Sequence, residues 1–336
     1  MTRPLALPIG VVDLVAKGEG RPSARSVAES VDLAIAVEEL GYHRFWIGEH
    51  HDPAGYACGS PEVLTGIIAA RTKTIRVGTG ALLLNLCDPR RVYESFEVLS
   101  GVFPGRIDLG LGRSQGDDRV DGGVPAAAGS VGSADYAAKV SDLKARCKTN
   151  IGHLPPNGLQ LWMLGAGLTS AALAGSLKLP FCFAHFFNPS KAAEAIALYR
   201  NTFRACTHEL GLPRVAMCVS VLCSGTLSDA RLLATSHLMW LARDRPGVAA
   251  PVPPPDPSFL SRLPQQEELL APPSRMLVGE ARDVARSLSS MSAQHELDEM
   301  LLTSVCFDAK ARLESYELLA NELQLMPSIP ARVFVP

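Results

Sequence analysis

Residues 75–112 read IRVGTGALLLNLCDPRRVYESFEVLSGVFPGRIDLGLG, and the alternation of apolar and helical segments begins to show there. Residues 75–84 form an apolar run, residues 89–102 have helical character with a proline in the first turn, and residues 106–112 are a second apolar run. Apolar runs that do not alternate with polar residues are typical of parallel strands buried on both faces. The stretch therefore predicts a strand, a covering helix and a second parallel strand.

The same alternation continues on both sides of this stretch. Predicted strands cover residues 5–15, 45–48, 75–84, 106–112, 159–164, 180–184, 215–224 and 299–303, and the helices that follow them cover 23–40, 61–71, 89–102, 134–147, 169–177, 189–206, 228–243 and 309–323. Eight strand and helix pairs favour an α/β fold of the TIM type, a (β/α)8 barrel, over its rival, a doubly wound open sheet. In both folds ligands bind at the carboxyl ends of the strands.

Two segments interrupt the alternation. Residues 114–133, after the fourth strand, are rich in Gly, Ser and Asp, and residues 246–273, before the eighth strand, hold nine prolines. Because proline at that density blocks helices and strand pairing, we expect irregular insertions there. Each is either a lid over the barrel mouth or a tolerated surface loop. A barrel of about 250 residues with two insertions accommodates residues 1–336 as a single domain.

The composition of the chain argues against several classes of binding partner. The net charge of -2 gives no basic surface for nucleic acid or for an anionic membrane. No apolar run reaches the roughly 18 to 20 residues of a membrane span, and the N-terminus does not resemble a signal peptide. The eight cysteines are scattered singly, which indicates a reducing compartment and no metal site. We therefore expect a soluble, cytoplasmic protein.

Three motifs at predicted strand ends carry candidate chemistry. Glu49-His50-His51 follows the second strand, where a histidine is either a general acid or base or a buried structural residue. The turn from Gly165 to Thr169 follows the fifth strand, and the free N–H groups of the helix after it, with Thr169 as cap, form either an anion site or a plain turn. Arg113, at the end of the fourth strand, would complete a phosphate pocket.

Residues 112–116 offer a competing interpretation. They match the Gly-x-Ser-x-Gly elbow of a hydrolase, with Ser114 as the nucleophile. That elbow needs a helix directly after it, and residues 117–123 are poor helix formers. The glycines at 110 and 112 also match half of a dinucleotide fingerprint, without its third glycine or its helix.

Four blocks taken together resemble the bacterial luciferase-like monooxygenase family. They are GYHRFWIGEHH at 41–51, SPEVL at 60–64, IRVGTG at 75–80 and PGRIDLGLGR at 104–113, in the family's order and spacing. Weaker similarity extends through residues 161–165, 179–181 and 315–320. The resemblance covers most of the chain, and it is far more specific than any single motif above.

This resemblance implies a TIM-type barrel that acts as a flavin-dependent monooxygenase with O2 and FMN, reduced by a separate flavin reductase. His50 matches the family's catalytic histidine. Gly80-Ala81 matches a dipeptide with a non-prolyl cis bond under the flavin ring. The residues that match the FMN phosphate site are Arg113, Gln115, Gly165, Ala166, Gly167 and Thr169. Ala166 stands where many relatives have serine, and Phe186 stands where histidine is common.

The substrate is expected to be a small hydrophobic molecule, because the apolar residues Leu84, Leu86, Phe186 and Phe187 lie in the loops that follow strands. The Ala-, Arg- and Pro-rich composition favours an aromatic polyketide or another secondary metabolite over a long-chain aldehyde. The enzyme would then act in biosynthesis. The resemblance also implies a homodimer through the second and third helices. Two alternatives remain within the fold: a deazaflavin-dependent oxidoreductase, and a flavin-binding protein without catalysis.

Overall fold

Strands and helices alternate along nearly the whole of the described chain. The computed structural model describes residues 7–51, 54–113, 133–149, 158–206, 211–243, 249–270 and 274–327. The strands are β1 (Ile9–Asp13), β2 (Arg44–Ile47), β3 (Arg76–Leu83), β4 (Ile107–Gly112), β5 (Gln160–Gly165), β6 (Phe181–Ala184), β7 (Val215–Cys223), β8 (Met276–Gly279) and β9 (Glu299–Thr303). The helices are α1 (Ser23–Glu39), α2 (Pro61–Arg71), α3 (Pro89–Val102), α4 (Ser133–Thr149), α5 (Leu168–Ser176), α6 (Ala192–Ala205), α7 (Leu227–Arg243), α8 (Gln266–Leu269), α9 (Ala281–His295) and α10 (Ala309–Leu323).

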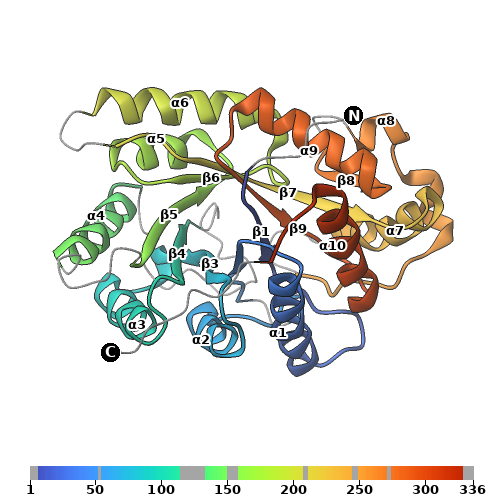
Figure 1. Ribbon diagram of the computed structural model, residues 1–336, viewed down its shortest axis with the longest axis horizontal. Coiled ribbons are helices and arrows are strands. Elements are labelled where there is room, and N and C mark those ends of the chain that lie inside the picture. Colours follow the sequence, from blue (N-terminus) through green and yellow to red (C-terminus); the bar gives the residue numbers. More distant parts are fainter. Residues whose placement is uncertain are drawn as a thin grey trace.

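Eight parallel strands close into a barrel, as the alternation predicts. Each strand from β1 to β7 pairs with the next, and β9 closes the ring by pairing with both β7 and β1. The helices form a layer around the strands (Figure 1). All residues of β4 and all residues of β7 are buried, which is why these strands read as continuous apolar runs. The open sheet that competed with the barrel is therefore excluded.

The segment before the last barrel strand differs from the prediction. Its described residues, 249–270, hold a 3-10 helix over Pro257–Arg262 and the short helix α8, where only irregular chain was expected. The side chain of Asp256 starts the first of these by accepting a hydrogen bond from the Ser258 N–H at 2.8 Å. The sequence interpretation also missed β8 and α9. β8 has only four residues beside a proline-rich stretch, too few to show a periodicity, whereas the apolar residues of α9 do recur at helical spacing and were overlooked. β8 pairs with the carboxyl end of β7.

The first strand is shorter than predicted. β1 ends at Asp13, whose carboxylate accepts a hydrogen bond from the Val15 N–H at 3.0 Å, and Val15 has a φ of 51°. A turn fixed by this bond interrupts the apolar run before residue 15. The predicted insertion at 114–133 lies outside the described residues except for Ser133, where α4 begins.

A cluster of buried ions fills the amino end of the barrel. Arg44 at the start of β2 pairs with Asp108 of β4 at 2.5 Å and with Glu299 of β9, and none of these three side chains is exposed. Arg76 binds the other oxygen of Asp108 at 2.6 Å, and Arg214 binds Glu299 at 3.0 Å. Buried charges of this kind are tolerated because they are mutually paired. The cluster leaves the carboxyl end as the place for a ligand.

Candidate functional site

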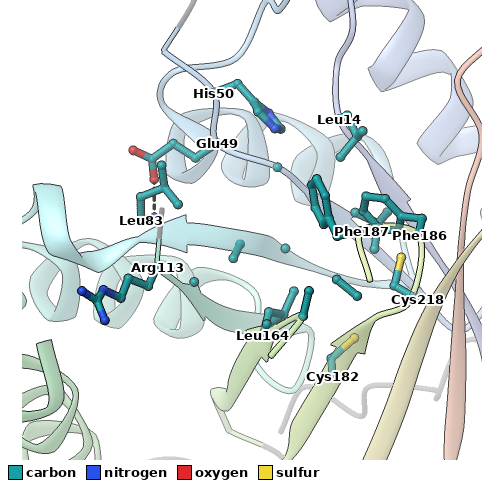
Figure 2. Close-up of a pocket in the computed structure, with 18 of the residues that line it drawn as sticks. Leu14, Glu49, His50, Leu83, Arg113, Leu164, Cys182, Phe186, Phe187 and Cys218 are labelled. Carbon is teal, nitrogen blue, oxygen red and sulfur yellow. Dashed lines mark hydrogen bonds between the residues drawn. The ribbon is translucent and has the colours of Figure 1, made fainter. Parts of the chain in front are cut away.

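A cavity of about 590 Å³ lies at the carboxyl ends of the barrel strands. Seven of the residues that line it are small and leave room for a bulky ring system: Gly48, Gly80, Ala81, Gly112, Gly165, Ala166 and Ala184. The other wall is apolar and includes Leu164, Phe186 and Phe187. Figure 2 shows His50 and the two phenylalanines on one side and Arg113 on another. A cavity with small and apolar walls and a few polar groups is typical of a cofactor site.

The floor of the cavity is formed by the end of β3. The peptide bond between Gly80 and Ala81 is cis, as the family resemblance implies. Gly112 of the neighbouring strand β4 must be glycine, because a Cβ there would lie 2.6 Å from the Cβ of Ala81. The two strand ends therefore approach each other more closely than larger residues allow.

His50 faces the cavity from the loop that follows β2. Its ring stacks on Tyr56, with the centroids 4.0 Å apart and the planes 9° from parallel, and its backbone N–H donates to the carbonyl of Cys58. Burial, with a smaller contribution from His51, lowers the pKa of His50 to about 4. The ring is therefore neutral near pH 7. Its Nδ1 atom is buried and has no hydrogen-bond partner among the described residues.

Glu49 holds this loop against the end of β3. One oxygen of its carboxylate accepts the Leu83 N–H at 2.7 Å, and the other lies 2.5 Å from Nε2 of His51 (Figure 2 shows the first of these bonds). The Glu49 N–H donates to the carbonyl of Ala81 at 3.1 Å. Burial raises the pKa of the Glu49 carboxyl. The two adjacent histidines thus differ: His51 pairs with Glu49, and His50 turns its ring to the cavity.

The predicted phosphate residues lie together at one side of the cavity, with two differences. Arg113, Gly165 and Ala166 line the cavity, and no carboxylate of the described chain pairs with the exposed Arg113. Gly167 and Thr169 do not line the cavity: Gly167 precedes α5, and Thr169 lies in its first turn. The prediction that Thr169 caps the helix was wrong. Gly167 takes that position with extended backbone, and α5 begins one residue earlier than expected, at Leu168.

Two residues to which the sequence interpretation gave no role support this turn. Ser170 packs so closely on the strand that a Cβ on Gly165 would lie 2.1 Å from its Oγ. Asn188, in the loop after β6, donates from its side-chain amide to the carbonyl of Ala166 at 3.1 Å. Ser170 closes the sequence motif that begins at Leu164, whereas Asn188 belongs to no motif and is brought to the turn only by the fold.

The remaining predictions have mixed outcomes. Phe186 and Phe187 line the cavity as expected, with their ring centroids 4.4 Å apart. The expectation for Leu84 and Leu86 was wrong: Leu84 is buried in the core around the barrel, and Leu86 is exposed in a 3-10 turn. Gln115 and Ser114 lie outside the described residues.

Searches for other kinds of site were restricted to the described ranges. Within them, no group of three or more His, Cys, Asp or Glu side chains is arranged to hold a metal ion. None of the described helices has both the length and the apolar character needed to cross a membrane. The eight cysteines are free thiols.

Comparisons with known proteins place the chain in a family. The model of the luciferase-like monooxygenase family matches residues 7–293. A luciferase-like monooxygenase of Escherichia coli (strain K12) is 34% identical over 321 residues, which cover 92% of this chain and 94% of that protein. The crystal structure of apo-MsnO8 is 32% identical, has a TM-score of 0.81, and is matched over 96% of this chain and 100% of that one.

More distant structures share the fold alone. One is the oxygenating constituent of a 3,6-diketocamphane monooxygenase of Pseudomonas putida in complex with FMN, at 17% identity and a TM-score of 0.68, covering 95% of this chain and 98% of that one. Another is an F420-dependent secondary alcohol dehydrogenase in complex with an F420-acetone adduct, at 15% identity and a TM-score of 0.68, covering 96% and 98%. Both flavins thus occur on this fold. The family match over most of the barrel, with a relative above 30% identity, shows that the chain belongs to the luciferase-like monooxygenases.

Proposed function

We propose that this oxidoreductase is a two-component monooxygenase, which takes FMN already reduced by a separate flavin reductase and uses it with O2 to oxygenate a hydrophobic small molecule. The observation that carries the proposal is one cavity that combines a floor of small residues, a neutral histidine, and an end formed by Arg113 and the turn before α5. No other group of described residues unites these three features.

The donor set fits FMN. Gly80, Ala81 and Gly112 would lie against the flavin ring, because residues without long side chains leave its face free. Arg113 and the first turn of α5 would hold the phosphate, since helix N-terminal N–H groups and an arginine fork are suited to an anion. When bound, reduced FMN supplies the electrons that activate O2. The protein contributes binding, orientation and shielding.

His50 is the residue proposed to take part in the chemistry. Because its ring is neutral, one nitrogen can donate a hydrogen bond and the other can accept a proton. Phe186 and Phe187 line the same space with apolar surface, which would disfavour water beside the histidine. A positioned histidine of this kind contributes about 10² to 10⁴ in rate.

The remaining partners are proposals as well. The flavin reductase would deliver its product by diffusion or by transient contact. A homodimer through α2 and α3 is supported by four exposed apolar side chains, Val63 and Ile67 on α2 and Val98 and Val102 on α3, with exposed fractions between 46% and 66%. Light scattering of the purified chain measures the oligomeric state directly.

Oxygen consumption separates the proposed function from its rivals. The protein is mixed with photoreduced FMN or with reduced F420, and O2 uptake, H2O2 release and oxygenated product are measured with a panel of hydrophobic substrates. We expect product with reduced FMN and O2. Hydride transfer from reduced F420 without O2 uptake would instead identify a deazaflavin-dependent oxidoreductase.

The variant His50→Ala tests the role of the histidine. It should bind reduced FMN as the natural protein does, form less product and release more H2O2. His43→Ala is the matched control, because His43 precedes β2 at the opposite end of the barrel and its pKa is also lowered to about 4. Unchanged product yield in His50→Ala would remove His50 from the chemistry.

A further inference from the structure

A second, smaller cavity of about 210 Å³ adjoins the first on the far side of His50. We call it the side cavity. Leu14, His50, Phe186, Phe187 and Arg275 line both cavities, so the two share a wall. The residues that belong to the side cavity alone are Tyr56, Ser220, His237, Trp240, Leu241, Thr303 and Val305.

Three polar side chains in this wall lack partners. Ser220 of β7, Thr303 of β9 and His237 of α7 have exposed fractions of only 1%, 2% and 6%. The hydroxyl oxygens of the first two and Nδ1 of His237 have no hydrogen-bond partner among the described residues. Ser220 and Thr303 are register partners on paired strands, so their side chains lie side by side on one face. Buried polar groups are normally paired, and unpaired ones clustered around a cavity point to a ligand.

His237 specifies what kind of ligand group fits. Burial lowers the pKa of His237 to about 4, which keeps its ring neutral, and the ring is hydrogen-bonded to the carbonyl of Val305. A carbonyl only accepts, so the ring donates its single proton there. Nδ1 has no partner and is therefore left as an acceptor. It needs a donor from the ligand, and a ketone or an ether oxygen has none.

The rest of the wall favours an uncharged ligand group. Leu14, Trp240, Leu241 and Val305 are apolar, and the one cation among the lining residues, Arg275, is exposed. A carboxylate would meet the lone pair of His237 instead of a donor and would lose its hydration. An ammonium group would meet no carboxylate in this lining.

We propose that the side cavity binds the hydroxyl end of the substrate, and that the substrate is an uncharged, hydrophobic alcohol or phenol. Its O–H donates to Nδ1 of His237, and its oxygen accepts a hydrogen bond from Ser220 or Thr303. The body of the molecule then passes His50 into the larger cavity. The oxygenation of the substrate in the larger cavity rests on the proposed function. The preference of the side cavity for a hydroxyl group does not.

The experiment is a calorimetric titration of the flavin-free protein with 2-naphthol and with its methyl ether, 2-methoxynaphthalene. The two probes have the same ring system, and only naphthol can donate. We expect the natural protein to bind naphthol at least tenfold more tightly. His237→Leu should bind the two probes equally, and the double variant Ser220→Ala/Thr303→Val should lower the affinity for naphthol at least threefold.

Thr65→Val is the matched control. Thr65 is also buried with an unpartnered hydroxyl, but it lies on α2 and lines neither cavity, so its variant should keep the full preference. If His237→Leu does not fold, as judged by circular dichroism, the single variants Ser220→Ala and Thr303→Val carry the test. Equal binding of the two probes by the natural protein, or an unchanged preference in His237→Leu, overturns the proposal.

Titration of the same proteins with reduced FMN keeps the two proposals apart. Variants of the side cavity should bind reduced FMN as the natural protein does. A natural protein that binds naphthol selectively but not reduced FMN would contradict the proposed function and support the side cavity. A natural protein that binds reduced FMN but shows no preference for naphthol would contradict only the proposal for the side cavity.

Discussion

Replacing Gly165 by alanine should weaken the binding of reduced FMN through its phosphate group. The new Cβ would lie 2.4 Å from the Cβ of Ser170 and 2.1 Å from its Oγ. Because carbon atoms in ordinary contact are about 3.5 to 4.0 Å apart, the first turn of α5 must move by about 1 Å. Overpacking of this kind destabilises a fold by about 1 to 3 kcal/mol.

The effect on binding is larger than the effect on stability. A displacement of about 1 Å lengthens an N–H···O bond from about 2.9 Å to a distance at which it no longer counts as a hydrogen bond. A bond to a charged group contributes about 1.5 to 3 kcal/mol, so each N–H that loses the phosphate lowers the affinity about 10- to 100-fold. Reduced riboflavin has no phosphate, and its affinity should change little.

Anaerobic titrations with reduced FMN and reduced riboflavin measure this difference. The ratio of the two affinities should fall at least tenfold in Gly165→Ala. Adding Ser170→Gly removes both atoms that collide with the new methyl group and should restore most of the ratio, whereas Ser170→Ala keeps the Cβ and should not. Equal losses for the two flavins, or no rescue by Ser170→Gly, would refute a phosphate site at the start of α5.

Three further predictions concern single groups. Arg113→Ala should weaken the binding of reduced FMN about 10- to 100-fold in the same titration and leave the unfolding midpoint unchanged, because the guanidinium is exposed and pairs with no carboxylate of the described chain; equal affinity would rule out the contact. The pKa values of His50 and His237 are about 4 in the folded protein against an ordinary 6.5, so the unfolded chain binds more protons between these values. The free energy of unfolding should therefore fall as the pH is lowered from 6.5 to 4, by up to about 1.4 kcal/mol per pH unit for each histidine, and urea titrations of His237→Leu should show a shallower fall. Glu299→Gln should lower the free energy of unfolding by about 3 to 5 kcal/mol, since Arg44 would keep its buried charge and lose one partner; a loss below 1 kcal/mol in urea would contradict the role of the cluster.

The barrel was predictable because most of its strands are buried on both faces. Such strands read as uninterrupted apolar runs, and the helices between them carry clear signals, such as Pro61 and Pro89 in first turns. β8 was not predicted, because Met276–Gly279 is short and follows a proline-rich stretch. It is held by the carboxyl end of β7, and that pairing has no local trace in the sequence.

For the candidate site, the motifs at strand ends could be recognised in the sequence, but the contacts that support them could not. The positions of His50, Arg113 and Gly165 follow from the rule that strand ends meet at the mouth of a barrel. The pairing of Glu49 with the Leu83 N–H joins residues 34 positions apart. The side cavity depends on β7, α7 and β9 together, so Ser220, His237 and Thr303 have no common motif. Their roles emerge only when the chain is folded.

The ion cluster at the amino end of the barrel also constrains how the protein is made. Arg44 and Glu299 are 255 residues apart, so at about 5 to 20 residues per second the ribosome adds the acid roughly 13 to 50 seconds after the base. During that interval the ring cannot close, because β9, which carries Glu299, joins β7 to β1, and burying the guanidinium without its second partner would be costly. The nascent chain should therefore stay open at this end until its last barrel strand emerges. The ion pair between Arg44 and Glu299 can therefore form only when β9 completes the ring.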